Sequence, residues 1–248
     1  MTLSEHIAEL RNRLLKSVAA IVVGTVVGWI YREPLLEVLK RPFETSVAAL
    51  LRSKGIQPQL TMTGVADPFT FNLKIAMVFG LVLSSPVWLY QMWAFVAPGL
   101  HRNEKKWALT FAAVAAPLFF AGILLGYFTL PKGIEILIGF TPKGVQNLIT
   151  LPSYLDFTLT TLLVFGIAFL IPVFVMLLNL AGVLPGRALG KARPYVIVAV
   201  FVFAAAATPS TDPFTMTFLA VPMCALFLGA EVLARMSDKR RAARRHDS

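Results

Sequence analysis

Residues 107–130, WALTFAAVAAPLFFAGILLGYFTL, form a run of 24 residues without a charged side chain. A helix of that length rises about 36 Å, which is enough to cross the roughly 30 Å hydrocarbon core of a bilayer. The rest of the chain has the same character, because 57% of its 248 residues are hydrophobic and only 15% are charged. This composition excludes an ordinary soluble enzyme and a disordered protein, and it indicates an integral membrane protein.

Five more apolar segments flank this run on both sides, so the chain is predicted to be an all-α membrane protein with six transmembrane helices. A short amphipathic helix over 2–13 is expected to precede the first span, and a basic tail over 235–248 is expected to be disordered. Together, residues 1–234 are predicted to form a single membrane domain. The predicted spans are 14–31, 69–97, 107–130, 152–182, 194–207 and 213–230. The fifth and sixth are short, and the fifth would rise only about 21 Å.

Two pairs of glycines are spaced for close helix packing. Gly24 and Gly28 lie four residues apart in the first span, and Gly122 and Gly126 do so in the third. Small residues at this spacing allow two membrane helices to approach closely. We therefore expect these faces to pack against neighbouring helices.

The net charge of +10 is distributed unevenly between the two sides of the membrane. Six spans place both termini on one side, and that side carries fifteen of the 23 Lys and Arg residues, mostly in short loops. The positive-inside rule therefore predicts cytoplasmic termini. With acids included, this side has a net charge of +9 and the other side +1, so a nucleic-acid partner is not needed to explain the basic excess.

The sequence offers little support for enzymatic chemistry. Cys224 is the only cysteine, which excludes an internal disulfide and a Cys-based zinc site, and the three histidines lie outside the apolar segments. Motifs for zinc hydrolysis, nucleotide binding and a serine nucleophile are absent. No enzyme activity and no cofactor are therefore expected. The alternative function is a small-solute transporter or channel, although the span interiors carry few polar groups; a membrane-embedded enzyme would lack a catalytic dyad.

Glu9 and Glu104 are minority acids on the basic side, and each lies close to the start of a membrane helix. A carboxylate accepts a bidentate pair of hydrogen bonds from a guanidinium, so two carboxylates on one surface could receive two arginines of a ligand. Simpler interpretations exist for both residues. Glu9 is placed to pair with Arg13 at i,i+4, and the helix dipole favours an acid at a helix start such as Glu104.

Several motifs resemble those of the TatC family. The run HIAELRNRL over 6–14 resembles the family pattern H-x-x-E-L-R-x-R-L, and LSSPVWLYQMWAFVAPGL over 83–100, followed by Glu104-Lys105-Lys106, resembles a second pattern. Shorter matches follow in the same order, at 193–196, at Thr208-Pro209 with Asp212, and at 220–223. The resemblance covers most of the chain, and the topology derived above agrees with it independently.

The resemblance implies the function of the multispanning receptor subunit of the twin-arginine protein translocase. Such a subunit binds twin-arginine signal peptides of folded precursor proteins at its cytoplasmic face. It assembles with single-span TatA- and TatB-like subunits, as a homo-oligomer within a receptor complex, for export driven by the proton-motive force. The implied location is a bacterial-type cytoplasmic (inner) membrane, with several passes and both termini in the cytoplasm.

The resemblance also assigns roles to individual positions of this chain. Those implied in signal-peptide binding are Glu9, Arg11, Phe95 and Glu104. Pro42 and Pro86 match motif prolines, and Thr208, Asp212 and Met216 lie where partner subunits are expected to dock. The chain departs from the family in two places, since Leu170 stands where many members have an intramembrane glutamate and Met216 where many have a glutamine.

Overall fold

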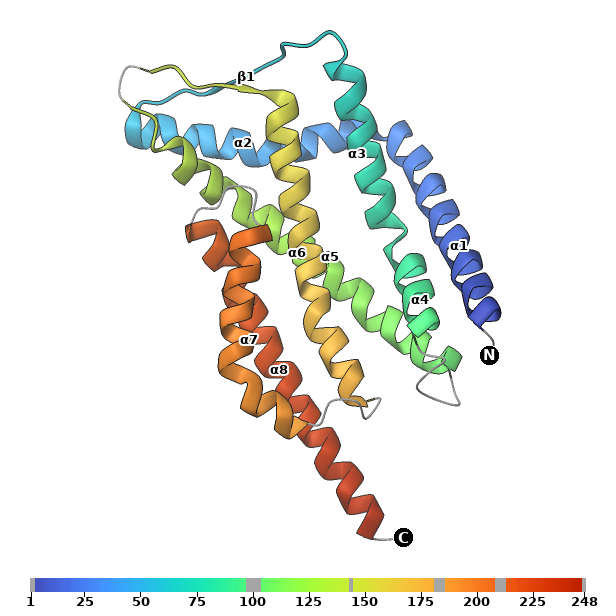
Figure 1. The fold of residues 1–248 in the computed structure, drawn as a ribbon. Coiled ribbons are helices and arrows are strands. Elements are labelled where there is room, and N and C mark those ends of the chain that lie inside the picture. The colour runs from blue at the N-terminus through green and yellow to red at the C-terminus, as the bar shows by residue number, and fades with distance from the viewer. Residues whose placement is uncertain (1–2, 97–103, 143–144, 181–185, 208–212, 247–248) are drawn as a thin grey trace.

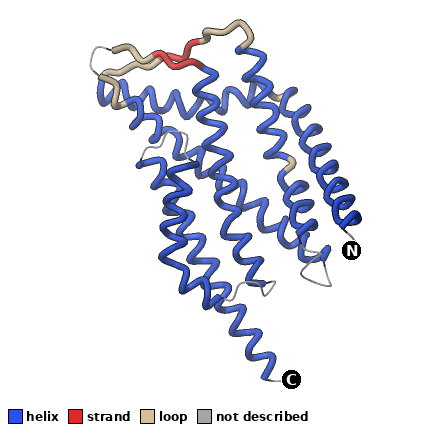
Figure 2. The backbone as a smooth tube through the Cα atoms, in the orientation of Figure 1, coloured by secondary structure: helices blue, strands red, loops and turns tan. Residues whose placement is uncertain are grey.

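The structure, a computed structural model, describes residues 3–96, 104–142, 145–180, 186–207 and 213–246 (Figure 1). Over these ranges the chain forms eight helices and two short strands. The helices are α1 Leu3–Ile30, α2 Arg32–Lys54, α3 Asp67–Leu83, α4 Ser85–Val96, α5 Glu104–Ile138, α6 Leu151–Leu180, α7 Gly186–Ala207 and α8 Pro213–His246. The strands β1 Gln59–Thr61 and β2 Leu148–Thr150 pair in parallel and lie at one end of the bundle (Figure 2).

The all-α membrane fold predicted from composition is confirmed. Five helices are long and apolar enough to cross a membrane, and α3 and α4 together form a sixth candidate that is bent by 58°. Large apolar side chains on α1, such as Leu14, Val18 and Val22, are exposed, as expected for a surface that faces lipid. The two C-terminal spans are the shortest of the five unbent candidates, at 20 and 24 residues. The fifth is nevertheless longer than the predicted 194–207, because α7 begins at Gly186 and continues through Pro194.

The helix boundaries differ from the prediction in several places. The expected amphipathic helix 2–13 and the first span form one continuous helix, α1, because no Pro or Gly interrupts the sequence between them. Residues 32–54 were expected to be part of a loop but form α2. This helix is polar, so apolar runs do not predict it. The expected disorder over 235–248 is also wrong as far as His246, because α8 continues through a segment of Arg, Lys and Ala, which favour helix.

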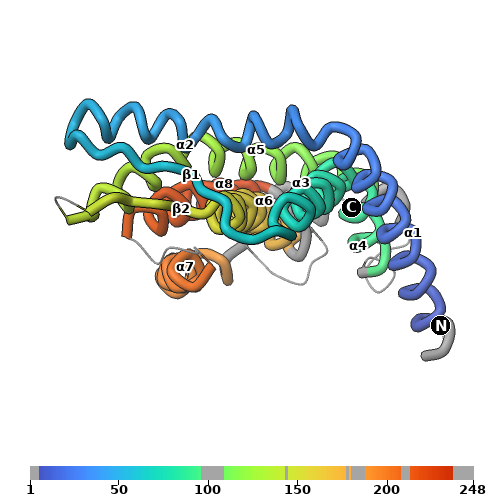
Figure 3. Tube along the Cα trace, turned by 90° about the horizontal axis from the view of Figure 1, so that it is seen from above, coloured from blue at the N-terminus to red at the C-terminus, as the bar shows by residue number. Residues whose placement is uncertain are grey.

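Both termini of the described chain lie at the same end of the bundle, and α2 and the two strands lie at the other (Figure 1). We call these the terminal end and the cap end. Seen from above, α2 runs across the cap end beside α5 instead of along the bundle (Figure 3). Hydrogen bonds in both directions fix the position of α2 against other helices. Tyr154 on α6 donates to Leu39 O of α2 at 2.6 Å, and Ser46 of α2 donates to Pro131 O on α5 at 2.8 Å.

The glycine pairs pack helices closely, as predicted. A Cβ atom at Gly24 would lie 2.8 Å from the carbonyl oxygen of Gly80, so α1 touches the backbone of α3. A Cβ atom at Gly122 would lie 2.5 Å from the carbonyl oxygen of Phe165, so α5 touches the backbone of α6 in the same way. These two seams hold α1 against α3 and α5 against α6, and they leave α4 between the start of α1 and α5.

Candidate functional site

The first turns of α1, the last turns of α4 and the start of α5 meet at the terminal end of the bundle (Figure 1). The break between α3 and α4 creates this arrangement. Pro86 is the second residue of α4 and lacks the N–H that would continue the helix, while the Trp88 indole N–H donates to Leu81 O at 2.9 Å across the break. The bend of 58° directs α4 towards the start of α1.

Glu9 on α1 lies in the seam with α4 and binds a guanidinium. Arg13 donates to Glu9 Oε1 from Nε at 2.9 Å and from Nη2 at 2.5 Å, which is the i,i+4 pair expected from the sequence. Arg13 Nη1 also lies 3.5 Å from Gln91 Oε1 on α4. The second carboxylate oxygen, Glu9 Oε2, is buried without a hydrogen-bond partner among the described residues. Glu9 therefore keeps one acceptor atom unused in a partly buried position.

Phe95, one turn beyond Gln91 on α4, contacts the same part of α1. Its ring stacks on the imidazole of His6, with centroids 4.6 Å apart and planes 21° from parallel. The His6–Phe95 stack and the Glu9–Arg13–Gln91 contacts lie within two helical turns of each other, so we refer to these five residues together as the α1–α4 seam site.

The sequence identified only part of this site. Glu9 and Phe95 are among the predicted residues, and the structure brings both to the seam. His6, Arg13 and Gln91 had no predicted role in binding. All three lie within the quoted motifs, and this position is the feature of the sequence that could have identified them. The i,i+4 pairing of Arg13 with Glu9 was considered only as an alternative to function.

The other two predicted signal-peptide residues are placed differently. Arg11 is exposed and lies two residues beyond Glu9, about 200° around the helix, so the structure does not bring its side chain to the seam. Glu104 is the first residue of α5, at the same end of the bundle, but its side chain is outside the described part of the structure. An acid at this first position fits the helix dipole.

The remaining predicted positions lie elsewhere. Thr208 and Asp212 are outside the described residues, between α7 and α8. Met216 is partly buried against the core formed by α6, α7 and α8. Leu170 packs against the apolar cluster around Leu89 and Trp93, so an aliphatic side chain is well accommodated where many family members have glutamate. Pro42 lies inside α2 at the cap end, far along the bundle from the seam site.

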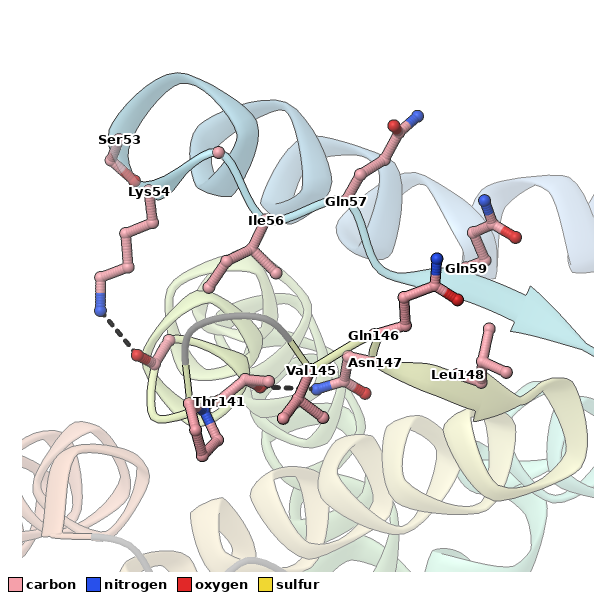
Figure 4. Close-up of a pocket in the computed structure, with 13 residues that line it drawn as sticks. Ser53, Lys54, Ile56, Gln57, Gln59, Thr141, Val145, Gln146, Asn147 and Leu148 are labelled. Atoms are coloured by element: carbon pink, nitrogen blue, oxygen red, sulfur yellow. Dashed lines mark hydrogen bonds between the residues drawn. The ribbon is translucent and has the colours of Figure 1, made fainter.

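A polar cavity of about 890 Å³ lies at the cap end, between the end of α2 and the segment that leads to β2 (Figure 4). Lys54 Nζ donates to Gly139 O at 2.7 Å on one side of it, and Asn147 Nδ2 donates to Thr141 Oγ1 at 2.8 Å on another. None of the predicted site residues lines this cavity. The seam site lies at the other end of the bundle, where α1 and α4 meet.

These features define a class: a multi-pass helical membrane protein whose polar site lies at one surface of the bundle. Comparison with known proteins identifies the family within this class. The chain belongs to the TatC family, because the family model described as Sec-independent protein translocase protein (TatC) matches residues 5–222. It is therefore a component of the Sec-independent, twin-arginine protein translocase.

Individual relatives support the assignment along nearly the whole chain. The Sec-independent protein translocase protein TatC of Frankia casuarinae is 41% identical over 100% of this chain and 69% of its own length. The corresponding protein of Xylanimonas cellulosilytica is 41% identical over 97% of this chain and 86% of its own length. A crystal structure of the twin-arginine translocase receptor TatC in DDM has a TM-score of 0.75 and 30% identity, and the match covers 92% of this chain and 99% of that one.

Proposed function

We propose that the α1–α4 seam site receives an arginine of a twin-arginine signal peptide through Glu9. The observation that carries this proposal is that Glu9 already binds a guanidinium, that of Arg13, through two N–H donors on one oxygen. The site is therefore built to accept an arginine at this position. The unused and buried Glu9 Oε2 supplies an acceptor for an arginine of the ligand while Arg13 stays bound to Oε1. Alternatively, the arginine of the ligand displaces Arg13.

The energetics favour arginine over lysine at such a site. Hydrogen bonds to a charged group contribute about 1.5–3 kcal/mol each, and a partly buried carboxylate that lacks one partner gains more from a new donor than a solvated one. A guanidinium presents two parallel N–H groups to one carboxylate, whereas an ammonium acts as a single point charge. A ligand with paired lysines would therefore lose the bidentate geometry although it keeps its charge.

Glu104 is proposed to receive the second arginine of the pair. It begins α5 at the end of the bundle that also holds Glu9, and it follows directly after the residues that connect α4 to α5. Phe95 is proposed to contact an apolar part of the signal peptide beside the arginines. The stacking of Phe95 on His6 holds its ring at the edge of the seam, which supports this role. For Arg11, which points away from Glu9, we propose contact with a more distant part of the same ligand.

The proposal extends to orientation and partners. The terminal end of the bundle is assigned to the cytoplasm, in a bacterial-type inner membrane, because the excess of Lys and Arg lies on that side. Single-span TatA- and TatB-like subunits are proposed to dock near Thr208, Asp212 and Met216, and the chain is proposed to act as a homo-oligomer in a receptor complex. The proton-motive force is proposed as the energy source for transport.

Site-directed crosslinking tests the signal-peptide site. A photoreactive residue introduced at position 9 or 104 should crosslink a bound twin-arginine precursor, whereas the same residue at position 33, an exposed acid at the cap end, should not. Export of a twin-arginine precursor should fall strongly when Glu9→Ala and Glu104→Ala are combined. Glu33→Ala is the matched control. Undiminished export by the double variant, at normal levels of the protein in the membrane, would reject the proposal.

A further inference from the structure

Two arginines converge on one buried carboxylate where α7 begins and α8 leaves the bundle, at the terminal end (Figure 1). Arg193 on α7 donates to Glu231 on α8 from Nε to Oε2 at 3.0 Å and from Nη2 to Oε1 at 2.8 Å. Arg235, one turn further along α8, brings its Nη2 to 2.6 Å from Oε1 of the same carboxylate. Glu231 and Arg235 have the i,i+4 spacing of an ion pair within one helix, whereas Arg193 reaches the same carboxylate from another helix.

The carboxylate and the two guanidinium groups differ sharply in exposure. The Glu231 side chain is 1% exposed, whereas those of Arg193 and Arg235 are 48% and 50% exposed. Within the described residues Glu231 is the only acid paired with either arginine, so the cluster carries a net charge of +1. Each guanidinium has five N–H donors, and the ones not directed at Glu231 remain available on the exposed side. The cluster is thus a fixed, outward-facing anion acceptor.

The position of Arg235 is fixed from beneath as well. A Cβ atom at Gly190 on α7 would overlap its Nη2 atom, so the guanidinium lies directly against bare backbone. This contact and the bond to Glu231 hold the arginine in place, which lowers the entropy that it would lose when it binds an anion.

An apolar row on α8 leads directly to Arg235. Val221, Leu228 and Val232 are exposed and lie 14, 7 and 3 residues before Arg235, so all four share one face of the helix. The apolar part of the row is about 16 Å long. Arg193 and Arg235 lie within the first and last few residues of the candidate spans Ala188–Ala207 and Pro213–Met236. In a bilayer crossed by these spans, both arginines would lie near the lipid head groups.

We propose that this cluster, Arg193, Glu231 and Arg235, is a binding site for an anionic phospholipid. The phosphate accepts hydrogen bonds from the exposed sides of the two guanidinium groups, and an acyl chain lies along Val221, Leu228 and Val232. Basic clusters between membrane helices at head-group depth bind such lipids, and arginine matches phosphate bidentately. The apolar row favours a lipid over free phosphate, because free phosphate has no acyl chain to pack against it. The inference depends on these spans crossing a bilayer and not on the proposed signal-peptide site.

Competition between two lipids tests the site. The full chain in dodecylmaltoside is mixed with equal amounts of dioleoylphosphatidylglycerol and dioleoylphosphatidylcholine, and bound lipid is counted by native mass spectrometry. The wild-type chain should retain the anionic lipid preferentially. Arg235→Leu, which leaves the Arg193–Glu231 pair intact, should reduce that preference about tenfold. Arg32→Leu, at a similarly exposed arginine on the cap end, is the matched control and should not change it.

Two further variants keep the test decisive. Arg235→Lys preserves charge and folding but cannot hold both Glu231 and a phosphate, so it should also lower the preference several-fold. Val232→Gln interrupts the apolar row and should reduce lipid retention without altering the weak binding of inorganic phosphate. Equal retention of both lipids by the wild-type chain, or an equal loss in Arg32→Leu, would overturn the proposal. Displacement of the lipid by millimolar inorganic phosphate, with no effect of Val232→Gln, would show a site for free anions instead.

Discussion

The Tyr127 hydroxyl on α5 donates a hydrogen bond of 2.9 Å to the carbonyl oxygen of Val38 on α2. In a regular helix that carbonyl would accept the N–H of the residue four positions later, but that residue is Pro42, which has none. The motif proline thus exposes an acceptor in α2, and a side chain from α5 occupies it. This relationship gives Pro42 a specific role, which is to connect α2 at the cap end to the membrane bundle.

The first prediction is a coupling between positions 42 and 127. Tyr127→Phe should lower the free energy of unfolding by about 1 kcal/mol, because Val38 O loses its partner. When Pro42→Ala is also present, the new N–H at position 42 satisfies Val38 O, and Tyr127→Phe should cost much less. Thermal unfolding of the four proteins in detergent provides this double-mutant cycle. Independent, additive effects would contradict the role given to Pro42.

A second prediction concerns the seam between α1 and α3. Gly80→Ala would place a Cβ atom 2.5 Å from Thr25 N and should destabilise the protein by about 1–3 kcal/mol through overpacking. Gly229→Ala is the matched control, since a Cβ atom there meets nothing within 4 Å and the helix gains propensity. The two variants should therefore shift the unfolding temperature in opposite directions, and a similar shift in both would argue against the close packing.

A third prediction links the bend between α3 and α4 to ligand binding. Trp88→Phe removes the indole N–H that bonds Leu81 O across the break, which should cost about 1 kcal/mol and change the direction of α4. Because α4 carries Gln91 and Phe95 of the seam site, affinity for a twin-arginine peptide should fall as well. Trp29 lies near the end of α1, far from the seam-site residues at its start, so the control Trp29→Phe should leave the affinity unchanged. Titration with a fluorescent peptide measures the affinity of both variants. Unchanged affinity in Trp88→Phe would show that ligand binding does not depend on the bend.

A fourth prediction ranks the two arginines around Glu231. Arg193 donates two hydrogen bonds to the carboxylate from another helix, whereas Arg235 adds one contact from the same helix. Loss of Arg193 removes two hydrogen bonds from the buried Glu231 carboxylate and leaves only the contact with Arg235. Arg193→Leu should therefore lower the unfolding temperature more than Arg235→Leu. Combining Arg193→Leu with Glu231→Leu should restore part of the loss, because no buried charge then remains. The reverse order of the two single variants would contradict this ranking.

The features that depend on hydrophobicity and on the spacing of small residues could be predicted from the sequence. The uncharged run that became α5 and the glycine pairs at Gly24 and Gly122 were assigned correctly, because a bilayer imposes long apolar helices and close approach requires small residues. The helix α2 was missed because its pattern is polar, and its place in the fold depends on tyrosines from α5 and α6 that no local pattern reveals.

The seam site shows a similar division. Glu9 and Phe95 could be named from the motifs, but their proximity depends on the bend at Pro86 and on the packing of α4 against α1. The pairing of Arg13 with Glu9 is local and was foreseen, whereas the contact of Arg13 with Gln91 joins residues 78 positions apart in the sequence. The second arginine around Glu231 was missed for the same reason, since Arg193 and Glu231 are 38 positions apart.

The central claim is that Glu9 binds an arginine of the ligand, and a binding cycle tests it most directly. The affinity of a signal peptide with paired arginines and of the same peptide with paired lysines is measured for the wild-type chain and for Glu9→Gln. We expect the lysine peptide to bind the wild-type chain at least about tenfold more weakly, and Glu9→Gln to remove most of this difference. An equal preference for arginine in both proteins would show that Glu9 does not recognise the arginines.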